Sequence, residues 1–240
     1  MKLAFSENYS PNFSTLRRNA KFIKFIIIHY TGMKSENRAI SRLCDVRSKV
    51  SCHYFIKKNG EIILMVPDIY IAWHAGISNW KKYKSMNKYS IGIEIQNSGH
   101  SNNYTSYKSK QILSLIKLCN YLKKKYKINK KNILGHSDIS YERKKDPGEK
   151  FPWFYLAKKN ISIWHNIDSR SLKILRNLKT SNSEKKIFFK NLLNFGYCLK
   201  KNKNSQKSLI LAFQRRFRNE LIDGIIDKEC LKISKKVGKL

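Results

Sequence analysis

The chain has 240 residues, of which 41% are hydrophobic and 12% aromatic, so it is long and apolar enough to fold around its own core. This composition excludes an intrinsically disordered protein. The 50 lysines and arginines outnumber the 16 acidic residues, and the formal net charge of +34 makes polyanions the first candidate partners. The alternative is that the lysines, which accompany many Asn, Ile and Tyr residues, reflect an A/T-biased coding sequence and lie on solvated surfaces.

The cysteines and the first residues bear on the compartment. Five cysteines lie far apart without a CxxC pair, so the sequence predicts neither a zinc ribbon nor a disulfide framework. The segment from Met1 to Phe5 becomes polar at Ser6, so we expect no signal peptide, and no apolar run is long enough for a transmembrane segment. We therefore expect a cytoplasmic protein. The alternative is the periplasm or cell envelope, reached by a leaderless route.

Strands alternate with helices in the first part of the chain. Residues 22–30 are β-branched and aromatic, which predicts a strand buried on both faces that ends at a histidine. Ser35 is placed to cap the helix that follows. Two apolar runs joined by Asn59 and Gly60 predict a β-hairpin. Residues 90–96 alternate, so Glu94 points away from the isoleucine face of its own strand.

Further elements complete this domain. Apolar residues at helical spacing between 112 and 122 predict a longer helix, and residues 132–135 predict a short strand that leads to His136. A turn-rich loop through Asp146 and Pro147 follows. The order of elements predicts an α/β fold with a mixed β-sheet flanked by helices over residues 1–165.

Only helical patterns follow this domain. Residues 166–182 are rich in Ser, Asn and Lys and predict a linker or loose connection. Ser183 is expected to cap a helix that ends at Gly196, a second helix is centred on Phe213, and Asp227 is expected to cap a third. The expectation is a small three-helix domain over residues 183–240 that folds independently.

Three polar residues follow predicted strands or turns and offer metal-binding atoms. They are His29, His136 and Asp146. Two imidazoles and one carboxylate form a known ligand set for a catalytic zinc that keeps one position for water. Their spacing alone is not a metal signature, and a single histidine at a strand end is more often structural.

The local sequences around these residues carry a specific resemblance. The motifs IIIHYT, SCHYFI, AWHAG, IGIEIQN, GHSDI and KKDPGEKFPW occur in this order between about Tyr9 and Trp164. They resemble the zinc-dependent N-acetylmuramoyl-L-alanine amidases of type 2. The resemblance implies a mixed sheet flanked by helices and hydrolysis of the amide that joins the lactyl group of muramic acid to L-alanine.

The resemblance also implies roles for individual residues. The zinc ligands fall on His29, His136 and Asp146, the catalytic glutamate on Glu94, and the catalytic lysine on Lys144. The last part of the chain, through AFQRRFRNELIDG, looks like the three-helix peptidoglycan-binding domain of one subgroup of these amidases. This second resemblance is looser, because the same residues suit any small helical domain.

Other residues in the motifs are candidates for substrate binding. We expect His74 to contact sugar or peptide, and Tyr30 and Trp73 to form walls of the cleft, with a place in the core as the alternative for both aromatics. His53 is equally consistent with the core. His100 and His165 lie outside the motifs and receive no role.

The main hypothesis is a zinc amidase, with Zn²⁺ as cofactor, that acts as a monomer on peptidoglycan or muropeptides. The alternative is a non-catalytic peptidoglycan-recognition protein, because the same fold serves as a sensor. All ligand and catalytic positions hold competent residues, which favours the enzyme. A nucleic-acid partner rests on net charge alone, because no basic helix with interleaved aromatics is present, so we expect no specific nucleic-acid binding.

Overall fold

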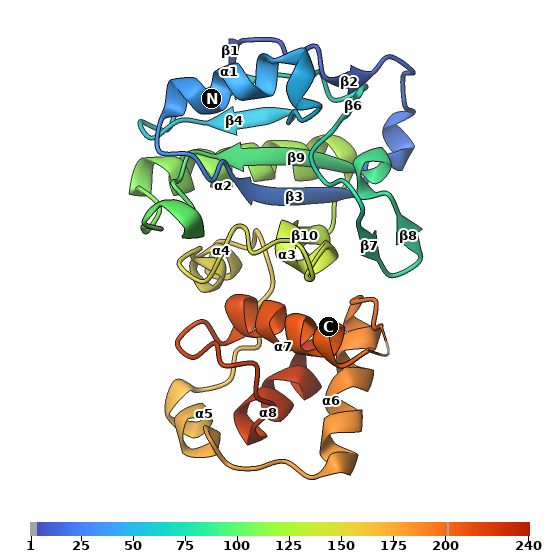
Figure 1. The fold of residues 1–240 in the computed structure, drawn as a ribbon, viewed down its shortest axis with the longest axis vertical. Coiled ribbons are helices and arrows are strands. Elements are labelled where there is room, and N and C mark those ends of the chain that lie inside the picture. Colours follow the sequence, from blue (N-terminus) through green and yellow to red (C-terminus); the bar gives the residue numbers. More distant parts are fainter. Residues whose placement is uncertain (1–3, 201) are drawn as a thin grey trace.

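The computed structural model describes residues 4–200 and 202–240, and a six-stranded mixed sheet lies at its centre (Figure 1). Met1 and the two residues after it, part of the expected leaderless N-terminus, lie outside the described residues. The strands in spatial order are β1 (Ser6–Glu7), β5 (Ile62–Leu64), β4 (Tyr54–Ile56), β9 (Ser90–Ile95), β3 (Phe25–Tyr30) and β10 (Ile133–Gly135). The predicted α/β fold with a mixed sheet is confirmed.

Parallel pairing dominates the part of the sheet that carries the polar strand ends. Three pairs are parallel: β10 with β3, β3 with β9, and β9 with β4. The predicted hairpin of β4 and β5 is antiparallel. Within β3, Ile26 and Ile28 belong to one core, and Phe25 and Ile27 belong to another. This alternation follows from the pleat of a strand and confirms that β3 is buried on both faces.

Helices cover both faces of the sheet. The long helix α2 (Ser109–Tyr126) packs on the isoleucine face of β9, and α1 (Glu36–Cys44), capped by Ser35 as predicted, packs near β4 and β5. The other elements of this part are shorter: helices α3 (His136–Ile139) and α4 (Trp153–Lys158), and two-stranded sheets of β2 (Phe13–Ser14) with β6 (Ile71–Ala72) and β7 (Asn79–Trp80) with β8 (Tyr83–Lys84).

Four helices form the C-terminal part, drawn in orange and red in Figure 1. They are α5 (Ser169–Leu175), α6 (Asn182–Phe195), α7 (Lys203–Phe217) and α8 (Lys228–Val237). The three predicted helices are present. As expected, α6 ends at Gly196 and Asp227 caps the start of α8. Two details differ. The predicted linker contains α5. Ser181, in place of the predicted Ser183, caps α6, because its hydroxyl accepts from the backbone amide of Glu184 while the carboxylate of Glu184 accepts from the backbone amide of Ser181.

The C-terminal helices share a core with the sheet. One continuous apolar cluster joins residues of β3, β10 and α3 to residues of α6, α7 and α8. Trp80 of β7 is 1% exposed and makes edge contacts with Phe195 and Tyr197. This arrangement differs from the independently folding domain that composition indicated. The reason is that apolar residues of the 75–86 and 134–139 segments belong to the same buried cluster as residues of the C-terminal helices.

A buried ion pair ties the two parts together. Arg216 of α7 contacts the carboxylate of Asp138 in α3, and both side chains are 1% exposed. Arg216 also donates to the carbonyl of Ile133 at 3.1 Å, and Tyr197 donates to Asp138 at 2.6 Å. Because Asp138 lies two residues after His136, this network holds the helix that carries a predicted metal ligand.

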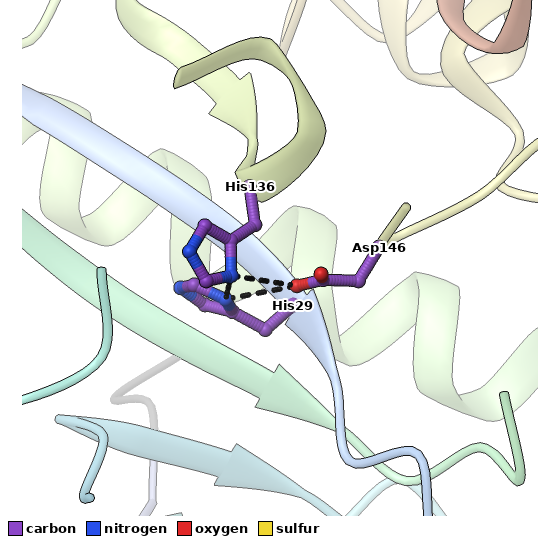
Figure 2. Close-up of side chains that lie close together, drawn as sticks. All are labelled: His29, His136 and Asp146. Atoms are coloured by element: carbon purple, nitrogen blue, oxygen red, sulfur yellow. Dashed lines mark hydrogen bonds and ion pairs between the residues drawn. The ribbon is translucent and has the colours of Figure 1, made fainter. Parts of the chain in front are cut away.

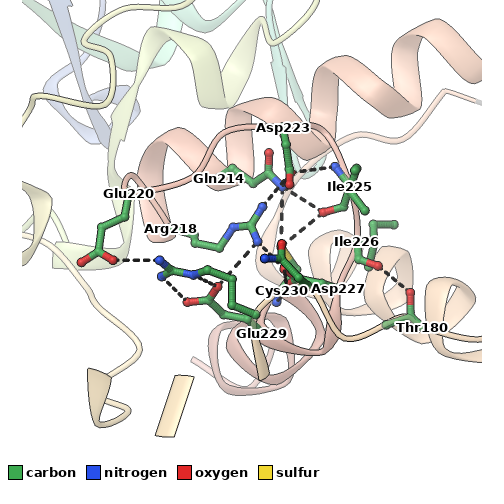
Figure 3. Close-up of polar contacts among 12 residues, drawn as sticks. Thr180, Gln214, Arg218, Glu220, Asp223, Ile225, Ile226, Asp227, Glu229 and Cys230 are labelled. Carbon is green, nitrogen blue, oxygen red and sulfur yellow. Dashed lines mark hydrogen bonds and ion pairs between the residues drawn. The ribbon is translucent and has the colours of Figure 1, made fainter. Parts of the chain in front are cut away.

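A second polar network closes the turn between α7 and α8 (Figure 3). The guanidinium of Arg218 is buried and contacts Asp223 and Asp227, and the side chain of Gln214 bonds Asp223 and the amide of Gly224. The turn after Asp223 is therefore held by Gln214 of α7 and by Arg218, which directly follows this helix. No helix in the described part of the chain is both long and apolar enough to cross a membrane.

We predict that Arg216→Met lowers the free energy of unfolding by about 3–5 kcal/mol, because it leaves the buried charge of Asp138 without its cationic partner. Chemical denaturation measures this value. Arg47→Met is the matched control: Arg47 pairs with Asp45 on the surface, where its side chain is 88% exposed, and the cost there is expected to be much smaller. Equal losses in the two variants would contradict the structural role of the buried pair.

Candidate active site

The side chains of His29, His136 and Asp146 converge on one point (Figure 2). Nδ1 of His29 lies 2.9 Å from Nδ1 of His136 and 3.0 Å from Oδ2 of Asp146, and the third distance is 3.1 Å. The three residues are 1%, 3% and 6% exposed. The sequence-based prediction that these residues form one group agrees with this geometry.

The sheet brings these residues together. His29 is at the end of β3, and the register pairs it with Glu94 of β9. Gly135, the last residue of β10, pairs with Ile28, so His136 follows one position later, level with His29. Parallel strands place their carboxyl ends at the same edge, which is where sites occur in such sheets. The loop after α3 then brings Asp146 back to the two rings.

The donor atoms fit a metal ion. Nε2 of His136 lies 3.1 Å from the carbonyl oxygen of Ala75, which can only accept a hydrogen bond, so this nitrogen carries the ring proton. Nδ1 of the same ring points toward the carboxylate of Asp146. Together with Nδ1 of His29, these atoms face one position and can act as a set of ligands for a cation. Two imidazoles and a carboxylate with an open fourth position suit a catalytic zinc.

The electrostatics of the group agree with metal binding. Burial, followed by the neighbouring His136, lowers the pKa of His29 to about 4, so the ring is neutral at physiological pH. Burial raises the pKa of Asp146, but the rings of His136 and His29 outweigh it and hold that pKa well below its usual range. A neutral imidazole and an ionised carboxylate are the forms that bind metals.

Glu94 lies beside this group on the polar side of β9. Its Oε2 atom is buried and has no hydrogen-bond partner among the described residues. Burial, followed by the charge of Asp146, raises the pKa of Glu94 to about 8, and Lys144 opposes this shift. A carboxyl group with a pKa near the working pH can both accept and return a proton. This placement agrees with the predicted catalytic role.

Lys144 is a basic residue that lines the cavity and acts on these groups. Its charge acts on both His29 and Glu94, and its side chain is partly buried. Lys145 is exposed, although both lysines line the same cavity. The structure therefore favours Lys144 over Lys145 as the cation at the reacting atoms, as predicted from the resemblance.

A cavity of about 580 Å³ opens over the site. Tyr30 and Trp73 line it, as predicted, and both are partly exposed. Tyr30 bonds Nδ1 of His100 at 2.8 Å, and His100 also lines the cavity. Sequence analysis missed His100 because it lies outside the motifs, in a loop that only the tertiary structure brings to the site.

Two other histidines of the motifs are also buried. His74 lines the cavity, is 8% exposed, and its Nδ1 lies 3.0 Å from Nε2 of His29. Its contact with sugar or peptide stays a prediction. His53 is fully buried and accepts from the amide of Gly92 at 3.0 Å, which places it in the core, one of the two alternatives for this residue.

Comparison with known proteins agrees with this geometry. Residues 18–149, more than half of the chain, match the N-acetylmuramoyl-L-alanine amidase family. The chain therefore belongs to this family of hydrolases, as the motifs predicted.

Particular relatives resemble most of the chain. The N-acetylmuramoyl-L-alanine amidase AmiD of Escherichia coli is 32% identical over 86% of this chain and 79% of its own length. Its complex with anhydro-N-acetylmuramic acid-L-Ala-D-γ-Glu-L-Lys superposes with a TM-score of 0.79 and covers 90% of this chain and 88% of that one. AmpDh3 of Pseudomonas aeruginosa, at 28% identity, has a TM-score of 0.80 and covers 95% and 96%. These matches include the C-terminal helices.

We predict that Glu94→Gln stabilises the zinc-free protein in a pH-dependent way. In the native wild type Glu94 keeps its proton up to about pH 8, whereas the unfolded chain loses it near the ordinary pKa of 4.5. The unfolding free energy of the wild type therefore decreases as the pH rises from about 4.5 to about 8. The glutamine variant has no proton to lose at this position, so its unfolding free energy lacks this decrease. The difference between the two proteins should grow by about 2–4 kcal/mol from pH 5 to pH 8. A constant difference across this range in denaturation experiments would contradict the raised pKa.

Proposed function

We propose that this protein is a zinc-dependent amidase that hydrolyses the bond between the lactyl group of muramic acid and L-alanine in peptidoglycan or muropeptides. The observation that carries the proposal is the convergence of His29, His136 and Asp146 beside an unpartnered carboxyl oxygen of Glu94 in one cavity. The substrate named in the AmiD complex supports the choice of a muropeptide.

His29, His136 and Asp146 would hold the zinc ion. When bound, zinc supplies a Lewis acid that makes water a better nucleophile and polarises the amide carbonyl. The neutral ring of His29 and the ionised carboxylate of Asp146 are already in the forms that this binding requires. The buried position of the three donors excludes bulk water from the reacting atoms.

The chain's own residues then supply proton transfer and charge. Oε2 of Glu94 accepts the proton of the attacking water and returns it to the nitrogen of the departing alanine. The ammonium of Lys144 lies where it stabilises negative charge that develops on the carbonyl oxygen. The products are the lactyl carboxylate and the free amine of the peptide, and no covalent enzyme intermediate is needed.

The direct test uses anhydro-N-acetylmuramic acid-L-Ala-D-γ-Glu-L-Lys as substrate. We expect the zinc-loaded protein to release the tripeptide and anhydro-N-acetylmuramic acid, which mass spectrometry identifies by their masses. Binding of the muropeptide without release of peptide would favour the alternative of a non-catalytic recognition protein.

We predict one zinc ion per chain. Elemental analysis of purified protein should find a ratio near one, and His136→Ala should bind less than about a tenth of that amount because it removes one of three ligands. His165→Ala is the control, because His165 is buried away from the ligand group and should leave zinc content unchanged. Wild-type protein that binds no added zinc would contradict the proposal.

We predict different effects for three substitutions near the reacting atoms. Glu94→Ala should keep zinc and substrate binding but lower kcat by at least about 100-fold, the usual scale of acid-base catalysis. Lys144→Ala should lower kcat and kcat/KM together by roughly 100-fold, because its charge acts on the transition state. Lys145→Ala is the control and should cost little. Loss of zinc from Glu94→Ala, or a silent Lys144→Ala with a damaging Lys145→Ala, would overturn these assignments.

The C-terminal helices are proposed to bind peptidoglycan. The similarity to AmiD extends through them, and the turn after Asp223 is fixed by Gln214 and Arg218 while its Ile225 side chain is 61% exposed. An exposed apolar group on a rigid turn suits contact with a sugar or peptide face.

We predict that Ile225→Ser weakens co-sedimentation of the full chain with intact sacculi several-fold and spares cleavage of the soluble muropeptide. Leu193→Ser, which changes another exposed apolar residue, at 47% exposure, serves as the control. Removing the helices is a poor test because they share the core of the sheet. Equal binding by both variants and the wild type would contradict a role for this turn.

The cytoplasm is the proposed compartment. The five cysteines are all unpaired, which is consistent with a reducing environment. Fractionation of the native cell tests this proposal.

A further inference from the structure

One short segment, residues 74–75, contacts the Nε2 atoms of both predicted histidine ligands. Nδ1 of His74 lies 3.0 Å from Nε2 of His29, and the carbonyl of Ala75 lies 3.1 Å from Nε2 of His136. In each ligand ring, Nε2 is therefore engaged by the 74–75 segment, and Nδ1 remains directed at the group with Asp146.

The hydrogen bonds behind His29 have a fixed direction. The hydroxyl of Ser90 lies 2.6 Å from the carbonyl of Met86, which only accepts, so the single hydroxyl proton is donated there. The hydroxyl oxygen of Ser90 must then accept from Nε2 of His74, 3.2 Å away. This nitrogen therefore carries the proton of the neutral His74 ring. Nδ1 of His74 is left as an acceptor. It receives the Nε2 proton of His29, so that Nδ1 of His29 presents its electron pair to the metal position.

Packing keeps His74 in this place. Ser90 is fully buried and His74 is 8% exposed. A Cβ atom on Gly92 would lie 2.4 Å from Cγ of His74, so the strand passes the ring at a distance that only glycine permits. Both ring nitrogens of His74 are occupied, which leaves the side chain no polar atom for a substrate.

The segment itself is held by a neighbouring side chain. Oδ1 of Asn87 accepts from the backbone amides of His74 and Ala75, at 3.1 and 2.7 Å. Asn87 therefore fixes both the ring that contacts His29 and the carbonyl that contacts His136.

We propose that His74 is a positioning residue that holds His29 in the tautomer and orientation required for zinc binding. The proposal rests on the proposed zinc function. Groups that bond the outer nitrogen of a metal-binding histidine typically change metal affinity 10–100-fold when removed.

The first test measures zinc affinity by competition with a chromophoric chelator. His74→Leu removes the acceptor and should weaken binding 10–100-fold. His74→Asn is smaller but keeps an acceptor oxygen near the position of Nδ1, so it should recover part of the affinity. His165→Leu is the matched control at a buried histidine away from the ligands and should leave affinity unchanged. Unchanged affinity in His74→Leu, with the fold shown intact by circular dichroism, would overturn the proposal.

The second test needs neither activity nor metal. Long-range proton–nitrogen NMR spectra of the zinc-free wild type at neutral pH should show the ring protons of His29 and His74 on Nε2. A proton on Nδ1 of either ring would overturn the proposal, even if the variants fail to fold. The two tests separate failure of this proposal from failure of the proposed function. A wild type that binds no zinc but shows these tautomers contradicts the zinc function alone, whereas a different tautomer contradicts the role of His74.

Discussion

Parallel pairing of β9, β3 and β10 is the constraint on which the site depends. Because the carboxyl ends of these strands meet at one edge, Glu94 and His136 lie beside His29 although both are far from it along the chain. The β-branched residues of β3 are packed on both faces, so its register with β9 cannot shift without exposing them. The chemistry therefore depends on the stability of the sheet core.

The C-terminal helices contribute to the same region. Arg216 is buried against Asp138, and α3, which contains Asp138, begins with His136. Farther along, Asn219 donates to the carbonyl of Glu149, in the loop that follows Asp146. The C-terminal part thus contacts two segments that supply the proposed metal-binding atoms. The proposed role of the turn after Asp223 in binding peptidoglycan is compatible with this support, because the contacts with the site come from Arg216 and Asn219.

Polar residues of the site occupy two layers. The inner layer holds the donors that face the cavity, and the outer layer, with His74 and Asn87, fixes their orientation. The outer layer explains why Gly92 occurs in a strand otherwise formed by large residues, since the ring of His74 fills the space of a side chain there. It also assigns a structural reason to the histidine of the AWHAG motif.

The sequence by itself determined the longer strands and helices, the hairpin at Asn59 and Gly60, and the residues of the candidate metal group, because periodicity, turn chemistry and local motifs are properties of short segments. It did not determine α5, because polar composition obscured a short helix that is stabilised by packing on α8. It missed His100 and the contact of His74 with His29, since contacts between distant segments leave no local signal. The union of the helices with the sheet was likewise decided by tertiary structure: Arg216 and Asp138 are 78 residues apart, and only burial shows that each charge needs the other.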